Sequence, residues 1–224
     1  MAKLEVACFN EQSAIIAAKE GADRIELCED YSLGGITPQL ETLQAIKKES
    51  DIPVYTMIRP RGGDFVYTEK EFEMMKSHLL QLKEAGADGF VFGILTKDQK
   101  LDLDKNKELV EMTSGLPCTF HRAFDRIEYK QEALEEIISC GFTTLLTSGG
   151  EHSAMEGLEN LKLLKVQAGN RLTILVGGGV RSHNVLVFKN DFDFVHSACI
   201  RTGTQIIDVK ELRNLKKKLN PNFN

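Results

Sequence analysis

The chain has 224 residues, of which 42% are hydrophobic, and its formal net charge is −5 at pH 7. Its basic residues are dispersed, so it lacks the basic stripe with interleaved aromatic side chains that nucleic-acid binding requires. No stretch is apolar enough to span a bilayer, and the N-terminal "MAKLEVACFNEQ" has no apolar signal core. We therefore expect a cytoplasmic protein with neither nucleic-acid nor membrane partners. Its five cysteines, odd in number and widely spaced, are typical of reduced thiols.

Short runs rich in β-branched and aromatic residues alternate along the chain with longer amphipathic stretches. The short runs predict strands at residues 4–8, 24–28, 53–59, 89–95, 118–122, 143–148, 173–177 and 193–198. The longer stretches predict helices at residues 11–20, 38–49, 69–85, 104–114, 129–140, 153–169 and 182–190. This α/β alternation predicts parallel strands joined by crossover helices. Eight strands in a chain of this length predict a closed (β/α)8 TIM barrel.

No linker or low-complexity stretch interrupts the chain, so we predict one domain over residues 1–224. The barrel should occupy residues 3–200, followed by a helical tail over residues 205–220. Helix boundaries carry the usual signals. Thr37 and Pro38 fit an N-cap and first helical position, and Thr68 with Glu71 fits a capping box. Three glycines stand where helices usually end, at Gly21, Gly86 and Gly141.

Alternation along the strands predicts which side chains point into the barrel. In "RIELC" the apolar Ile25 and Leu27 suit the helix-covered face, which turns Arg24, Glu26 and Cys28 inward. The same reasoning turns inward a further set, namely Glu5, Ala7, Tyr55, Met57, Arg59, Thr119, His121, Ser148 and His196. Buried charges must pair or line a wet site. One interpretation is a structural network in which Glu26 and Arg59 neutralise each other; the clustering at strand ends favours a functional pocket.

Three loops carry residues suited to ligand binding. In "RPRGGDF", Arg59 and Arg61 can bind a carboxylate or phosphate, the glycines allow close approach, and Asp64 can hold an arginine. A glycine turn with solvated arginines is the alternative, above all for Arg61.

In "TFHRAFDR", the candidates for proton transfer and binding are His121, Arg122 and Asp125. In "LVGGGV", the backbone of Gly178 and Gly179 can present N–H groups to an anion, although a tight turn explains the glycines equally well.

Metal-ligand motifs are sparse in this sequence. There is no CxxC, no HxxxH and no dense array of cysteine and histidine, which argues against a structural zinc site. Cys8 and Cys28 end neighbouring strands, and two thiolates would suit Cu(I). Alternation opposes this pair, because it turns Cys28 inward and Cys8 outward. Buried structural thiols are the alternative for all five cysteines.

Together, the blocks "SAIIAAKEGADRIELCEDYSLGGITP", "IRPRGGDFVYT", "TFHRAFD", "LLTSGG" and "VHSA" resemble the CutC family, named for copper homeostasis. The resemblance runs from about residue 3 to about residue 200. It implies a cytoplasmic TIM barrel, often a homodimer, with a role in copper homeostasis and Cu(I) binding. Of the family's two cysteines proposed as copper ligands, Cys28 is present, whereas Ala7 stands at the other position and Cys8 follows it. The family's polar positions are retained at Glu5, Glu26, Arg59, Arg61, Asp64, His121, Arg122, Asp125, Ser148 and His196.

Two hypotheses follow. The first is a copper-homeostasis protein that binds Cu(I) through Cys28 with His121, His196 or Cys8. The second is an enzyme acting on a small anionic molecule at the carboxyl ends of the strands, with Glu26, His121 and Asp125 as catalytic candidates. Its ligand-binding candidates are Glu5, Arg59, Arg61, Asp64, Arg122, Ser148, Gly178, Gly179 and His196. No dinucleotide fingerprint or Walker loop indicates a nucleotide cofactor.

Overall fold

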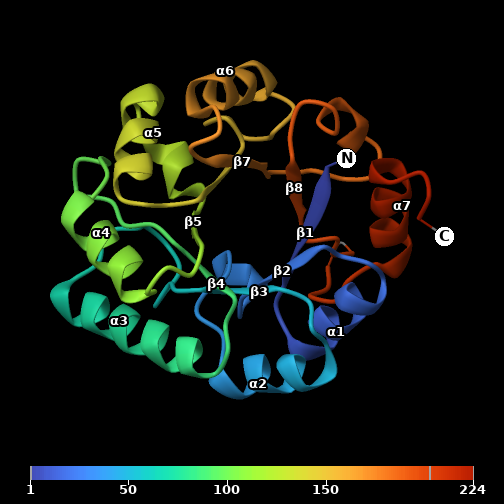
Figure 1. The fold of residues 1–224 in the computed structure, drawn as a ribbon, viewed down its shortest axis with the longest axis horizontal. Coiled ribbons are helices and arrows are strands. Elements are labelled where there is room, and N and C mark those ends of the chain that lie inside the picture. The colour runs from blue at the N-terminus through green and yellow to red at the C-terminus, as the bar shows by residue number, and fades with distance from the viewer. Residues whose placement is uncertain (1, 202, 224) are drawn as a thin grey trace.

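A computed structural model describes residues 2–201 and 203–223. Eight parallel strands close into a barrel in chain order, with β8 paired to β1, and the helices form a ring around it (Figure 1). The TIM-barrel prediction is therefore confirmed. The strands are β1 Lys3–Cys8, β2 Arg24–Leu27, β3 Val54–Met57, β4 Gly89–Phe92, β5 Cys118–Phe120, β6 Thr144–Thr147, β7 Thr173–Val176 and β8 Phe194–Ser197.

Among the described residues, seven α-helices form the outer ring, and three short 3-10 helices lie in the connections after β2, β5 and β7. The α-helices are α1 Glu11–Lys19, α2 Leu40–Glu49, α3 Glu69–Glu84, α4 Leu103–Met112, α5 Lys130–Ser139, α6 Leu158–Ala168 and α7 Val209–Leu219. The 3-10 helices are η1 Tyr31–Leu33, η2 Arg122–Arg126 and η3 Val185–Val187. Helix α7 packs against β1 and α1. No helix in the described part of the chain is long and apolar enough to cross a membrane.

Three predicted helices differ from the structure, and each difference has a physical cause. The helix predicted at residues 153–169 begins at Leu158, because the N–H of Ala154 donates to the carbonyl of Gly178 and holds this segment in the loop after β6. Helix α2 begins at Leu40 because the Thr37 hydroxyl bonds the backbone of Arg59, both as donor to its carbonyl and as acceptor from its N–H. The helix predicted at 182–190 is reduced to η3, since the N–H and hydroxyl of Ser182 both donate to Glu211 on α7. The predicted capping box of Thr68 with Glu71 is confirmed.

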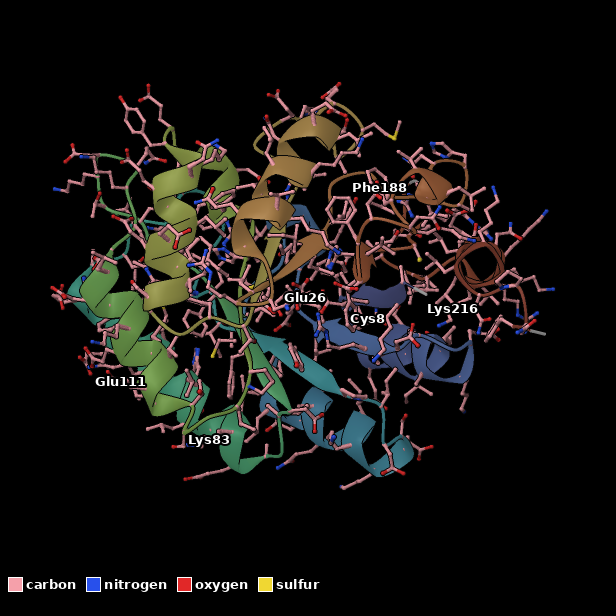
Figure 2. The ribbon with its side chains drawn as sticks, turned by 45° about the horizontal axis from the view of Figure 1, so that its top comes forward. Cys8, Glu26, Lys83, Glu111, Phe188 and Lys216 are labelled. Carbon is pink, nitrogen blue, oxygen red and sulfur yellow. The ribbon has the colours of Figure 1, made fainter. Side chains whose placement is uncertain are left out.

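Alternation along the strands separates two apolar layers. Leu4, Val6 and Cys8 belong to the large core between the strands and the helices. Cys28 packs instead with Tyr55, Met57 and Val91 in a small cluster inside the barrel. Cys8 and Cys28 thus lie on opposite faces of the sheet, as the alternation predicted. Glu26 lies towards the centre of the barrel and Lys216 on the outer helix α7 (Figure 2).

Candidate functional site

A cavity of about 370 Å³ opens at the carboxyl ends of the strands, the end of a TIM barrel where ligands usually bind. The residues that line it come from β1, β2, β3, β6 and β8 and from the loops after most of the strands. Seven of the predicted site residues line this cavity: Glu26, Arg59, His121, Arg122, Gly178, Gly179 and His196. The other seven, Glu5, Cys8, Cys28, Arg61, Asp64, Asp125 and Ser148, do not.

A chain of ionisable groups, Arg24, Glu5, His196 and Glu26, runs from the barrel interior to the wall of the cavity. Glu5 is level with Arg24 on one neighbouring strand and with His196 on the other. Its carboxylate accepts from Arg24 Nε at 2.6 Å and lies 2.7 Å from His196 Nδ1. The other ring nitrogen, His196 Nε2, lies 3.9 Å from Glu26 Oε2. Glu5 therefore orients His196 so that Nε2 faces Glu26.

The two carboxyl groups of this chain have opposite pKa shifts. Burial works to raise the pKa of Glu5, but Arg24 and His196 outweigh it and lower this pKa. Burial raises the pKa of Glu26, and His196 offsets this only in part. Burial works to lower the pKa of His196, but Glu26 and the hydrogen bond to Glu5 outweigh it and raise this pKa. Glu5 is therefore a fixed anion, whereas Glu26 and His196 both hold a proton to higher pH than usual.

His121 has the opposite character. Burial, with the nearby Arg59 cation, lowers the pKa of His121 to about 3. Its Nδ1 accepts the backbone N–H of Ala123 at 3.3 Å, so the neutral ring carries its proton on Nε2. That Nε2 is buried and has no hydrogen-bond partner among the described residues. The neutral ring suits a role as hydrogen-bond donor better than a role in proton transfer near neutral pH.

Arg59 is committed to backbone carbonyls. Its guanidinium donates to Leu33, Gly35 and Gly63 at 2.9, 3.0 and 3.1 Å, and it lies 4.9 Å from the ring centroid of Phe65. The Glu26–Arg59 pair required by the structural interpretation is absent from the ion pairs of the described residues. Arg59 joins the loops after β2 and β3.

Arg61 points to helix α3 and away from the cavity. Its guanidinium donates to Glu71 at 2.6 Å, to Asp64 at 2.9 Å and to the carbonyl of Val66 at 2.7 Å. The structure therefore does not bring Arg61 and Asp64 together with the other predicted residues.

Arg122 reaches the cavity from the loop after β5, held by two residues that do not line it. Its Nε donates to Asp125 at 2.7 Å and its Nη2 to the Ser148 hydroxyl at 2.9 Å. Asp125 also accepts from the backbone N–H of Ser148 at 3.2 Å and of Gly150 at 3.1 Å. Asp125 therefore positions the Arg122 guanidinium but does not itself line the cavity.

The loop after β7 supplies the hydrogen-bond donors predicted at Gly178 and Gly179 and a cation, Arg181, that was not predicted from the sequence. Gly178 and Gly179 have φ of 100° and 77°, in the left-handed region that glycine adopts readily. Within residues 2–201 and 203–223, neither backbone N–H donates a hydrogen bond. Arg181 lines the cavity, and its side chain forms no hydrogen bond or ion pair with the described residues. The signal in the sequence was a basic residue directly after "GGGV".

The positions and burial of the side chains decide which cysteines, carboxylates and histidines could bind a metal ion. The Cys28 thiol lies 3.5 Å from Glu26 Oε2, and burial followed by this carboxylate raises the pKa of Cys28 well above its usual value. A thiol ligand binds metal as the thiolate, which this environment disfavours. Glu5, Glu26 and His196 each offer a ligand atom within 4.8 Å of the others. Two carboxylates and an imidazole suit a divalent ion better than Cu(I).

These features define a class: a (β/α)8 barrel with a ligand-sized cavity, lined by both apolar and charged side chains, at the carboxyl ends of its strands. The chain belongs to the CutC family, whose sequence profile matches residues 2–200. It is 46% identical to the copper homeostasis protein cutC homolog of Homo sapiens over 182 residues, which are 81% of this chain and 67% of that protein. It is 41% identical to a CutC family protein of Photorhabdus laumondii over 202 residues, 90% of this chain and 81% of that protein.

Solved structures agree with this assignment. The structure of CutC from Streptococcus agalactiae matches with a TM-score of 0.84 at 32% identity, covering 88% of this chain and 99% of that one. Thiamine phosphate pyrophosphorylase from Pyrococcus furiosus matches with a TM-score of 0.65 at 17% identity, covering 98% of this chain and 96% of that one. The second likeness shows the barrel fold alone.

Proposed function

We propose that this protein binds a small anionic molecule at the mouth of its barrel and exchanges a proton with it through Glu26 and His196. One observation carries the proposal: unpaired donors and the Glu26–His196 pair line one cavity. The donors are the side chain of Arg181 and the backbone N–H groups of Gly178 and Gly179, with Arg122 beside them. Guanidinium and backbone N–H groups are the usual partners of carboxylates and phosphates in proteins.

The proton-transfer part of the proposal rests on the shifted pKa values. An ordinary glutamate holds no proton near neutral pH, but burial raises the pKa of Glu26, and Glu26 in turn raises that of His196. Groups that have shifted pKa values and line a ligand-binding cavity are suited to act as general acid or base. Glu5 would act only as a positioning residue, because its lowered pKa keeps it ionised.

Calorimetric titration with inorganic phosphate and with acetate tests the anion site. We expect the wild-type protein to bind at least one of them, and Arg181→Met to weaken that binding about tenfold, the range for a charge-assisted hydrogen bond. Arg171→Met is the matched control, since Arg171 is exposed and pairs with Glu135 on the outer surface. No binding to the wild-type protein, or equal binding by Arg181→Met, would contradict the proposal.

A second candidate, a role in copper homeostasis with Cu(I) as the bound ion, is favoured by the name of the human relative and by Cys28. The thiol of Cys28 lies near Glu26, which itself neighbours His196. Cytoplasmic location and a homodimer belong to this same proposal. A competition titration with Cu(I) under reducing conditions should show binding that Cys28→Ala removes. Cys118→Ala is the control, since Cys118 begins β5 in the outer core. Binding that survives in Cys28→Ala would exclude this candidate.

A further inference from the structure

The side of the cavity next to β1–β3 is aromatic. Phe9 follows β1, Tyr31 stands in η1 after β2, and Phe65 follows β3; all three line the cavity, and we call them the aromatic wall. The rings of Phe9 and Tyr31 pack edge to face with centroids 5.1 Å apart. Phe65 lies 4.7 Å from the His121 ring. Nothing in the anion site itself requires these three rings.

Tyr31 is the most telling member of this wall, because it is 46% exposed although its loop is firmly held. Asp30, at φ 53°, accepts from the backbone N–H groups of Ser32 and Leu33. Arg59 donates to the carbonyl of Leu33 from the other side. A large aromatic ring fixed at a cavity rim and left partly uncovered is well placed to contact a ligand at little entropic cost.

Two of the three arginines that line the cavity, Arg122 and Arg181, stand on the opposite side of the ring of strands. In a closed barrel of eight strands in chain order, β1 faces β5 and β3 faces β7. Arg122 follows β5, whereas Gly178, Gly179 and Arg181 follow β7; we call these four residues the cationic wall. On the aromatic side, the Arg59 guanidinium already donates to three backbone carbonyls, and Glu26 on β2 offers an anion no positive charge. The anionic end of any ligand is therefore directed to the cationic wall, and a different chemical group must cover the aromatic wall.

We infer that the ligand is an anion with an aromatic body, whose head binds the cationic wall while its ring packs against Phe9, Tyr31 and Phe65. This inference rests on the proposed anion site and names the class of molecule that it takes. The cavity of about 370 Å³ fits such a two-part molecule, because ligand pockets of this size usually bind molecules larger than a simple inorganic anion. Glu26 and His196 then lie beneath the middle of the ligand.

Calorimetric titration with two pairs of probes tests the inference: phenyl phosphate against methyl phosphate, and benzoate against acetate. In each pair the head is constant and only the body changes. We expect the aromatic probe of at least one pair to bind wild-type protein about tenfold more tightly, the ratio expected for burying and packing one ring. Tyr31→Ala should remove most of this preference and leave methyl phosphate or acetate binding unchanged. Arg181→Met should weaken both members of the pair to the same extent.

Tyr129→Ala is the matched control, since Tyr129 is 58% exposed and precedes α5 on the outer ring. Phe9→Ala provides a second variant of the aromatic wall. Equal affinity for both members of each pair would overturn the inference and leave the anion site intact. A preference that survives in both Tyr31→Ala and Phe9→Ala would also overturn it. Failure of all four probes to bind would overturn the proposed function together with the inference.

Discussion

Glu5 and Glu26 are the same residue type in the same barrel, yet their partners give them different properties. Glu5 is fully buried and bonded to both Arg24 and His196, so its charge is neutralised locally. Arg24 in turn lies 4.3 and 4.4 Å from the ring centroids of Tyr55 and Phe194. Glu26 Oε1 has no partner among the described residues. The contrast separates a structural ion pair from a group available to a ligand.

This contrast predicts strong coupling between Glu5 and Arg24. Glu5→Gln should lower the free energy of unfolding by about 3–5 kcal/mol, because it leaves the buried Arg24 uncompensated. Arg24→Met should destabilise to a similar extent for the converse reason. The double variant should lose less than the sum of the two, since neither charge then remains unpaired. Urea unfolding of the four proteins measures the coupling; additive effects would show that the two groups act independently.

His121 predicts a specific acid sensitivity. Its pKa is about 3 in the folded protein and about 6.5 when unfolded. As pH falls below 6.5, the unfolded chain therefore takes up a proton that the folded chain refuses until pH 3. Stability contributed by the neutral ring is present above pH 6.5 and lost towards pH 3, by on the order of 5 kcal/mol.

His121→Asn should therefore flatten the dependence of unfolding free energy on pH by about one proton between roughly pH 4 and pH 6. Asparagine can still accept the backbone N–H of Ala123, which limits other damage. His183→Asn is the control, because His183 is exposed. Urea unfolding at a series of pH values gives the slopes, and an unchanged slope in His121→Asn would contradict the assignment.

From the sequence, the face of the sheet on which a side chain lies was predicted more accurately than the group with which it interacts. Alternation placed Glu5, Glu26 and Cys28 correctly, because it depends only on the two-residue period of a strand. It left open whether Arg59 pairs with Glu26, and Arg59 instead donates to carbonyls in the loops after β2 and β3. Side-chain reach and loop path decide such contacts, and neither follows from periodicity.

Among the elements, the loop after β7 is the one whose backbone is most directly part of the site. A Cβ added to Gly178 would lie 2.9 Å from the Cβ of Ser148, and φ there is +100°. Gly178→Ala should lower the free energy of unfolding by about 1–3 kcal/mol through the backbone conformation and the clash. It should also abolish phosphate or acetate binding, because Ser148 holds Arg122.

Gly115→Ala is the matched control for this loop. Gly115 has φ +91° and nothing within 4 Å of an added Cβ, so this variant has the backbone strain without the clash. It should lose about 1 kcal/mol of stability and retain anion binding. Thermal unfolding and calorimetry together separate the two effects. Intact binding by Gly178→Ala would show that this loop does not form the anion site.

Element positions were predictable where the pattern was local. The eight strands were located because each is a short apolar run between turn residues, and the structure shortens most of them by one to three residues at their ends. The prediction of a helix over residues 182–190 was wrong although the local pattern suits a helix. The reason is a distant contact, because Ser182 donates to Glu211, nearly thirty positions later in the chain. Arg181 was overlooked because the sequence does not show which arginines keep their side chains free of partners in the folded protein.

At the scale of the whole molecule, helix α7 covers the seam where the barrel closes. Strand β8 pairs with β1 there, and α7 packs on β1 and α1, with Lys216 donating to Asp23 at 2.6 Å. Figure 1 shows α7 beside this pair of strands. The prediction of one domain over the whole chain requires that α7 unfold together with the barrel.

Leu215→Ala tests that requirement. Leu215 is fully buried, so the variant should lose about 2–5 kcal/mol of unfolding free energy through the cavity it creates. Thermal unfolding should remain a single transition at a lower midpoint, with near-ultraviolet and far-ultraviolet circular dichroism changing together. Leu163→Ala on α6 is the control, because Leu163 is 59% exposed and its loss should change stability by less than about 0.5 kcal/mol. An early transition confined to part of the helical signal would show instead that α7 unfolds independently of the barrel.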